Sequence, residues 1–112
     1  MVTYSNEAKE DLLRVQKDTM IKNGAVSEET ATEMAANARK LFNSDVAVSV
    51  TGIAGPGGGT AAKPVGLVWI GLSTKSKTFA KKFIFEGDRD TVRMSAANTA
   101  LRILIDTVVD TH

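Results

Sequence analysis

A glycine-rich run between two apolar segments constrains this chain more than any other feature. Residues 45–50 are mostly apolar, and so are residues 66–72. Five of the eight residues 52–59 between them are glycine. Glycine permits positive φ and lets an anion or a flat ring approach the main chain closely. The pattern therefore predicts two buried strands joined by a loop, and this loop is either a ligand site or a plain flexible connection.

The glycine loop matches neither common phosphate-binding motif. A P-loop ends in Gly-Lys-Ser/Thr and opens a helix, and the dinucleotide fingerprint also opens a helix. Here Gly59 is followed by Thr60-Ala61-Ala62-Lys63-Pro64 and then by the second strand. A phosphate at this loop would therefore be held by a nest of backbone N–H groups, by the hydroxyls of Thr51 or Thr60, or by Lys63.

The composition excludes several kinds of site. At 112 residues the chain is a single domain, 1–112, that buries roughly two thirds of its surface. The net charge of +1 gives no field that would attract nucleic acid or an acidic membrane. There is no cysteine, and His112 is the only histidine, so we expect no metal site and no Ser-His-Asp triad. With no membrane-length apolar stretch and no signal-type start, we expect a soluble cytoplasmic protein.

The first half of the chain predicts a helix that packs on a central strand. Ser27 is suited to cap a helix, and Glu28 and Glu29 follow in its first turn, where the helix dipole favours negative charge. Residues 46–50 lack polar alternation, which is typical of a strand covered on both faces. The helix carries one apolar stripe at helical spacing: Ala31, Met34, Ala35, Ala38, Leu41 and Phe42.

The second half predicts a hairpin followed by a long helix. The polar turn 73–77 is too short for a crossover, so strands 66–72 and 78–85 should pair antiparallel, with Trp69 in the core. Lys81 interrupts the apolar face of the last strand, which indicates an edge strand or a bulge. Asp88 should cap a helix from Arg89 to about Thr107 or beyond. Its expected core stripe is Ala97, Leu101, Leu104, Ile105 and Val108.

The order of these segments predicts an α/β fold. Helices alternate with strands, and the hairpin adds an antiparallel pair. We expect a small mixed sheet with helices on both faces, an α/β/α sandwich.

Tyr4 and Lys9 bracket the predicted start of the first helix. A cation near a helix N-terminus is disfavoured in its charged form, so a partly desolvated Lys9 amine would be a proton acceptor. Ser5 precedes Lys9 by four residues, which permits a Ser–Lys dyad. The residues alone favour the simpler alternative, in which Ser5 caps the helix and Lys9 faces water.

Basic side chains form two further groups. Arg89 and Arg93 share one face at the start of the last helix, where they either grip a phosphate or pair with nearby carboxylates. Four lysines cluster on the hairpin, and we interpret them as a charged edge that prevents strand aggregation rather than as a nucleic-acid site. These four are Lys75, Lys77, Lys81 and Lys82.

Four stretches of the sequence, taken together and in their order along the chain, carry a family resemblance. They are residues 4–9, 24–29, 50–59 with 63–66, and 87–89 with 92–93. Together they resemble the C-terminal domain of the CinA (competence/damage-inducible) family, and the glycine loop is the specific part of the match. The resemblance implies an α/β/α fold. For members of the deamidase type it implies hydrolysis of the amide of nicotinamide mononucleotide to nicotinic acid mononucleotide and ammonia, without a cofactor.

The resemblance also implies roles for individual residues. It assigns Tyr4 and Lys9 to the catalytic group, which favours an active Lys9 and disfavours the Ser5–Lys9 dyad. Arg93 is the implied phosphate ligand. The implied substrate-binding residues of the loop are Thr51, Gly52, Gly55, Gly57, Gly58 and Gly59.

One departure from the family pattern matters. A segment resembling Ser-Cys-Thr-Gly-Gly, thought to carry the family's nucleophilic serine, does not occur in these 112 residues. We therefore expect the domain to lack its usual first strand and helix, covalent catalysis to be impaired, and exposed apolar surface to be covered by homo-oligomer formation. Three hypotheses follow: a nicotinamide-mononucleotide amidase, a non-catalytic nucleotide-binding or assembly protein, and a piece of a longer enzyme.

Overall fold

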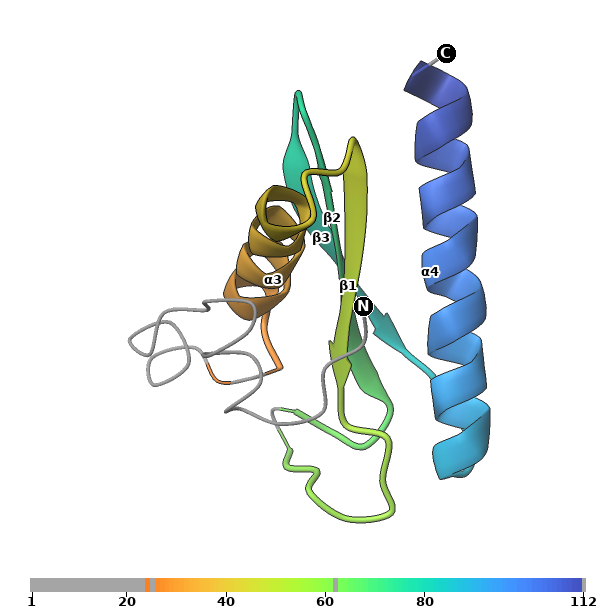
Figure 1. Cartoon of the computed structure of the whole chain (residues 1–112). Helices are drawn as coiled ribbons and strands as arrows, with labels where there is room; N and C mark the ends of the chain where they lie inside the picture. Colours follow the sequence, from red (N-terminus) through yellow and green to blue (C-terminus); the bar gives the residue numbers. More distant parts are fainter. Residues whose placement is uncertain (1–23, 25, 62, 112) are drawn as a thin grey trace.

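In the part of the chain that the structure describes, two helices enclose a three-stranded sheet. The computed structural model describes residue 24 and residues 26–61 and 63–111, so the predictions for Tyr4, Ser5 and Lys9 lie outside the described residues. Figure 1 shows α3 on one face of the sheet and α4 on the other, which confirms the α/β/α layering. The described elements are α3 (Glu28–Leu41), β1 (Val46–Gly52), β2 (Leu67–Thr74), β3 (Thr78–Ile84) and α4 (Arg89–Thr111).

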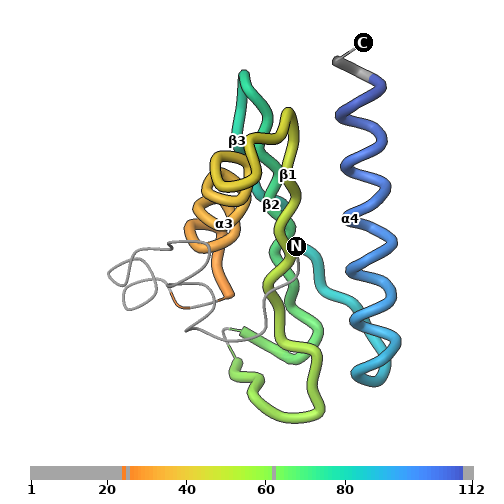
Figure 2. Tube along the Cα trace, in the orientation of Figure 1, coloured from red at the N-terminus to blue at the C-terminus, as the bar shows by residue number. Residues whose placement is uncertain are grey.

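The described sheet has the order β1-β2-β3 and is antiparallel at both pairings. The predicted hairpin of β2 and β3 is confirmed, and β3 is an edge strand in an unbroken register without a bulge (Figure 2). The α/β class is confirmed as well. A mixed sheet needs a parallel pair, and the strands in the described part of the chain form none.

The two faces of the sheet carry side chains of different size. Ser49 and Gly71 are cross-strand partners on the face toward α3, while Val50 and Ile70 are partners on the face toward α4. The Ser49 hydroxyl donates a hydrogen bond of 2.7 Å to the carbonyl oxygen of Ala31 in α3. A Cβ at Gly71 would collide with that same carbonyl oxygen. Small residues on this face therefore allow α3 to lie close to the sheet.

Helix α3 forms as its sequence predicts. Ser27 is its N-cap in an extended conformation, and the backbone N–H of Thr30 donates to the Ser27 hydroxyl at 3.2 Å. Four members of the predicted stripe are buried, from Ala31 to Ala38. The prediction is wrong for Leu41 and Phe42, which are 46% and 58% exposed, because the helix ends there and the chain turns away into β1.

Helix α4 uses a different face from the predicted one. Its buried residues are Val92, Ala96 and Ala100, which pack on Val68 and Ile70 of β2. The predicted stripe is wrong, since Leu101 and Ile105 are 56% and 52% exposed, Ala97 and Val108 are also exposed and Leu104 is only half-buried. Large side chains already fill this face of the sheet, so it accepts the small side chains of the helix.

Trp69 also differs from its prediction. It is half-buried rather than in the core, and it lies on the face of the sheet that packs on α3. At this position the sheet pairs Trp69 with Thr51 and with Lys82, whose side chain is exposed.

Candidate functional site

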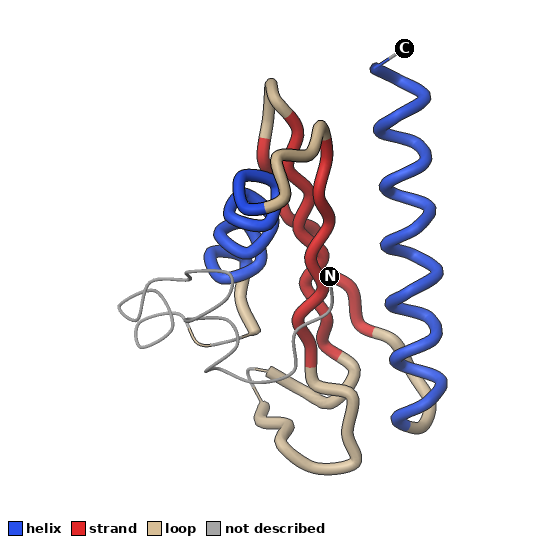
Figure 3. The backbone as a smooth tube through the Cα atoms, viewed as in Figure 1, coloured by secondary structure: helices blue, strands red, loops and turns tan. Residues whose placement is uncertain are grey.

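The glycine loop, residues 53–66, lies at the end of the sheet where both described helices begin. Figure 3 shows β1 entering the loop at this end, next to the first turns of α3 and α4. Helix N-termini carry a partial positive charge and present unpaired N–H groups. This end of the molecule therefore favours an anionic ligand, as the sequence also suggested.

Arg89 connects the loop to α4. Its guanidinium Nη1 donates a hydrogen bond of 3.1 Å to the carbonyl oxygen of Gly55. Arg93 lies one turn further along α4 and is exposed. The sequence brought the two arginines together on one face, but the resemblance assigned only Arg93 to the site. The signal for Arg89 was its position as the first helical residue after the Gly87-Asp88 cap.

Hydrogen bonds order both ends of the loop. At its base, the amide of Gly66 donates to the carbonyl oxygen of Ile53 at 2.6 Å. The amide of Ile53 donates to the carbonyl oxygen of Leu67 at 2.9 Å. Near its far end, the amide of Thr60 donates to the carbonyl of Lys63 at 2.8 Å, and the Lys63 amide returns a bond to the Thr60 hydroxyl at 2.9 Å. These bonds favour a shaped loop over a plain flexible connection.

The loop glycines serve two different purposes. A Cβ at Gly55 would lie 2.6 Å from Cγ1 of Val65, and one at Gly59 would lie 2.6 Å from the Val65 amide nitrogen, so both glycines are needed for packing. A Cβ at Gly57 would meet nothing within 4 Å, and at Gly58 the nearest atom would be 3.8 Å away. The backbone at Gly57 and Gly58 is therefore bare and open to an approaching ligand.

Thr51 and Gly52 close the end of β1. Thr51 is buried at 3% exposure, and the strand register turns its side chain toward α3. Gly52 is exposed, and a Cβ there would lie 2.8 Å from Cγ2 of Val68. Both residues have structural reasons for their identity, and their assignment to substrate binding stays a prediction.

Lys63 reaches from the loop toward the segment before α3. A Cβ at Gly24 would lie 2.7 Å from the Lys63 Nζ atom. The carbonyl oxygen of Gly24 in turn accepts hydrogen bonds from the hydroxyls of Ser27 and Thr30, at 3.0 and 2.7 Å. The loop thus adjoins the start of α3 on one side, through Lys63, and the start of α4 on the other, through Arg89.

Asp88 caps α4 at this end of the molecule. The backbone N–H of Thr91 donates to its carboxylate at 2.8 Å. This bond, with a smaller contribution from the Thr91 hydroxyl, lowers the pKa of Asp88 below its ordinary value of 3.8. Within the described residues there is no group of three His, Cys, Asp or Glu side chains that could hold a metal ion, and no helix long and apolar enough to cross a membrane.

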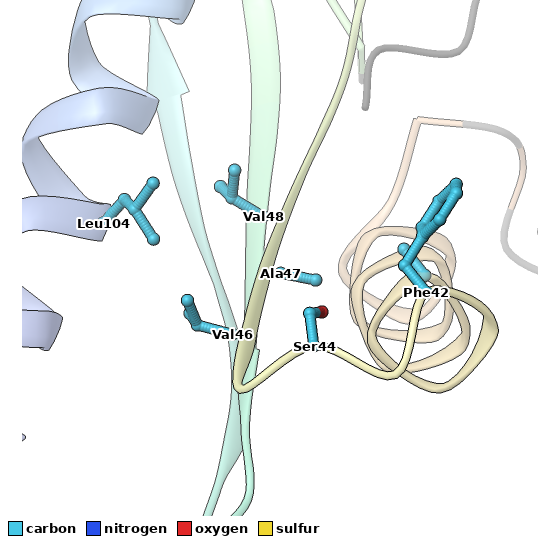
Figure 4. Close-up of a pocket in the computed structure, with 7 residues that line it drawn as sticks. Phe42, Ser44, Val46, Ala47, Val48 and Leu104 are labelled. Carbon is cyan, nitrogen blue, oxygen red and sulfur yellow. The ribbon is translucent and has the colours of Figure 1, made fainter.

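An apolar groove lies at the opposite end of β1. Figure 4 shows this groove between the end of α3, β1 and α4, and its lining is apolar apart from Ser44. No lysine or arginine lines it, so it does not suit a phosphate. The lining residues are Ala38, Phe42, Ser44, Val46, Ala47, Val48 and Leu104.

Comparison with known families matches residues 1–108 to the CinA C-terminal domain. The chain belongs to the CinA C-terminal domain family. A CinA-like protein of Endomicrobium trichonymphae is 53% identical over 112 residues, which is all of this chain and 26% of that protein. A CinA-like protein of Petrotoga mobilis is 51% identical over 108 residues, 96% of this chain and 27% of its own length. The chain thus spans about a quarter of these curated relatives.

Solved structures agree with the family assignment. The competence/damage inducible protein CihA from Agrobacterium tumefaciens superposes with a TM-score of 0.89 at 42% identity, covering 93% of this chain and 64% of that one. A competence or damage-inducible protein from Enterobacter asburiae gives a TM-score of 0.88 at 34% identity, with 96% and 67% coverage. The described α/β fold is therefore the fold of CinA superfamily proteins.

Proposed function

We propose that the glycine-loop end of this domain binds nicotinamide mononucleotide and takes part in hydrolysis of its amide. The observation that carries the proposal is the 3.1 Å hydrogen bond from Arg89 to Gly55, which ties the first residue of α4 to a loop whose backbone is bare at Gly57 and Gly58. A flat ring needs such an open main chain, and a phosphate needs the cations that flank it. As a nucleotide-processing protein, it is proposed to act in the cytoplasm.

The phosphate is expected to contact Arg93 and the amides of the loop. Asp88 already accepts the N–H of Thr91 at the start of α4, so this helix N-terminus is occupied by a carboxylate. A dianionic phosphate is therefore expected further out, where the guanidinium of Arg93 and the N–H groups of residues 57–59 can donate to it. Arg89 is then a positioning residue, because its bond to Gly55 holds the loop against α4.

Hydrolysis of the amide requires a proton acceptor and a donor to the leaving nitrogen. Water adds to the carbonyl carbon, the C–N bond breaks, and the nitrogen leaves as ammonia. The resemblance places Lys9 and Tyr4 in the catalytic group. We propose that Lys9 takes the proton from the attacking water and returns it to the nitrogen, and that Tyr4 stabilises the charge that develops on the oxygen. Both residues are proposed from sequence.

Binding without hydrolysis is the second candidate function. The sequence contains no cysteine and therefore no copy of the Ser-Cys-Thr-Gly-Gly segment that carries the family's nucleophilic serine. The glycine loop and its two arginines would still bind the nucleotide. Only an assay for turnover separates the two candidates.

Two measurements test this function together. Calorimetric titration with nicotinamide mononucleotide should give binding that Arg93→Ala weakens by ~10-fold or more, the loss of a charge-assisted contact of about 1.5–3 kcal/mol. Arg102→Ala is the matched control, because it removes the same charge from an exposed position about two and a half turns further along α4. Absence of binding to the unmodified chain contradicts both candidates.

An ammonia-release assay then decides between hydrolysis and binding alone. Turnover that Lys9→Ala abolishes supports the amidase, while binding with no ammonia release supports the second candidate. Turnover that Lys9→Ala leaves unchanged would remove Lys9 from its proposed role.

A further inference from the structure

Val65 lies between the two limbs of the glycine loop and contacts both. A Cβ at Gly55 would lie 2.6 Å from its Cγ1 atom, and a Cβ at Gly59 would lie 2.8 Å from its Cγ2 atom. The two methyl groups of one side chain therefore hold the loop at two points. Between these points lie Gly57 and Gly58, where the backbone is bare.

The backbone of Val65 is itself fixed by a turn. The amide of Leu67 donates to the carbonyl oxygen of Pro64 at 3.1 Å, and Gly66 supplies the positive φ of 95° at the third position of this turn. The amide of Phe85 donates to the carbonyl oxygen of Gly66 at 2.9 Å, and a Cβ at Gly66 would collide with the carbonyl oxygen of Phe85. The turn is thus anchored to the residue that follows β3.

The Val65 side chain is also stiff. Valine carries two heavy atoms on its Cβ, which restricts its χ1 rotamers. The side chain is half-buried and apolar, so it offers no hydrogen bond to a ligand. Its contribution to the site is therefore the shape that it gives to the loop.

Arg89 holds Gly55 from a second side, because its Nη1 donates to the Gly55 carbonyl oxygen. At the middle of the loop the support is weaker. A Cβ at Gly58 would have Cγ2 of Ile53 as its nearest neighbour, at 3.8 Å, and one at Gly57 would meet nothing within 4 Å. The directions of the N–H groups of residues 57–59 therefore depend on the two points at which Val65 holds the loop.

We propose that Val65 is a positioning residue of the glycine-loop site. Its methyl groups fix the separation of Gly55 and Gly59, and this directs the N–H groups of residues 57–59 toward an anionic group of the ligand. A nest of this kind binds more tightly when it is ordered in advance, because ordering a loop on binding costs affinity. The identity of the ligand, nicotinamide mononucleotide, rests on the proposed function, whereas the order of the ligand-free loop does not.

NMR relaxation of the isotope-labelled, ligand-free chain tests the positioning role. In the unmodified chain the amides of residues 57–59 should have order parameters of about 0.85, and Val65→Ala should lower them below about 0.6 while the amides of β2 stay unchanged. Val65→Thr keeps a branched side chain of the same shape and should retain the rigid values. Val109→Ala is the matched control, since it makes the same change at a position of α4 that is 66% exposed, and it should leave the loop unaffected. A loop that is flexible in the unmodified chain, or that Val65→Ala leaves rigid, would overturn the proposal.

Calorimetric titration with nicotinamide mononucleotide tests the consequence for binding. Val65→Ala should raise the Kd by ~5-fold or more, while Val65→Thr and Val109→Ala should stay within ~2-fold of the unmodified chain. An unchanged Kd in Val65→Ala, with the loop loosened, would overturn the role of Val65 in binding. Absence of binding to the unmodified chain would overturn the proposed function and this role together, whereas rigid loop amides in Val65→Ala would overturn the role of Val65 alone.

Discussion

Helices α3 and α4 cover opposite faces of one sheet, yet they relate to it in different ways. α3 buries Ala31, Met34 and Ala35 completely and lies close to small residues of the sheet. α4 buries Val92, Ala96 and Ala100 and leaves larger side chains, such as Leu101, exposed. Periodicity in the sequence therefore identifies an apolar helix face, but it does not show whether that face is buried in the core of the same chain.

The two faces of the sheet explain this contrast. Toward α3 the sheet presents Ser49 and Gly71, so the helix backbone lies close to the strands, and Met34 is the one large side chain that the helix buries. Toward α4 the sheet presents Val50, Ile70 and their neighbours, and the space left accepts alanine.

A pair of methionine variants tests the contrast most strongly. Met34 is fully buried beneath α3, whereas Met94 on α4 is 66% exposed. Met34→Ala should lower the free energy of unfolding by about 2–5 kcal/mol through lost burial and the cavity left behind. Met94→Ala should change the free energy of unfolding by less than about 0.5 kcal/mol. Denaturant unfolding at low protein concentration measures both changes in stability. Equal losses for the two variants would contradict the contrast between α3 and α4.

Gly71→Ala sharpens the account of the α3 interface. Its new Cβ would meet the carbonyl oxygen of Ala31 and lie 2.5 Å from the hydroxyl oxygen of Ser49, so α3 has to move outward. We expect a loss of about 1–3 kcal/mol in unfolding free energy, the usual range for overpacking. Gly57→Ala is the matched control, because a Cβ there meets nothing within 4 Å. If Gly57→Ala lowered the unfolding free energy as much as Gly71→Ala, the claim that Gly71 is required by the close approach of α3 would be contradicted.

The two helix caps should respond differently to acid. We expect this change in stability to be the smallest of the three predicted here. Ser27 caps α3 and does not titrate, whereas Asp88 caps α4 with a pKa held below 3.8. Because the folded-state pKa is lowered, the stabilisation by Asp88 is present above its ordinary pKa and is lost as the pH falls through the lowered value.

Asp88→Asn isolates this effect, since asparagine also caps helices but carries no charge. The unfolding free energy of the unmodified chain relative to this variant should decrease between neutral pH and pH below 3.8. A relative stability that stays constant across this range would show that the charged form of Asp88 contributes nothing to the start of α4.

Much of the fold could be predicted from local signals. The Ser27 cap, the apolar run of β1 and the polar turn into β3 each act within a few residues, and all three are confirmed. The burial pattern of α4 could not be predicted, because two apolar faces of similar length compete on that helix. Which one meets the sheet depends on side chains such as Ile70 and Phe83 that are distant in sequence.

The candidate site was predictable in position but not in detail. Glycine content predicted where the loop lies, while the assignment of Arg93 to the site, which rests on family resemblance, stays a prediction. The division of the glycines into those that pack on Val65 and those that are bare depends on how the loop folds back on itself, as does the bond from Arg89 to Gly55. Such contacts join residues that are separated in the sequence, so sequence patterns alone do not predict them.

The most direct test of the central claim is to map nicotinamide mononucleotide binding by NMR, following the backbone amide signals of the isotope-labelled chain during a titration. The account predicts that the largest shifts fall on the glycine loop, above all Gly57 and Gly58, and on the first turn of α4 through Arg93. Shifts concentrated instead on the groove beside β1 or on the second half of α4, with the loop unaffected, would contradict it.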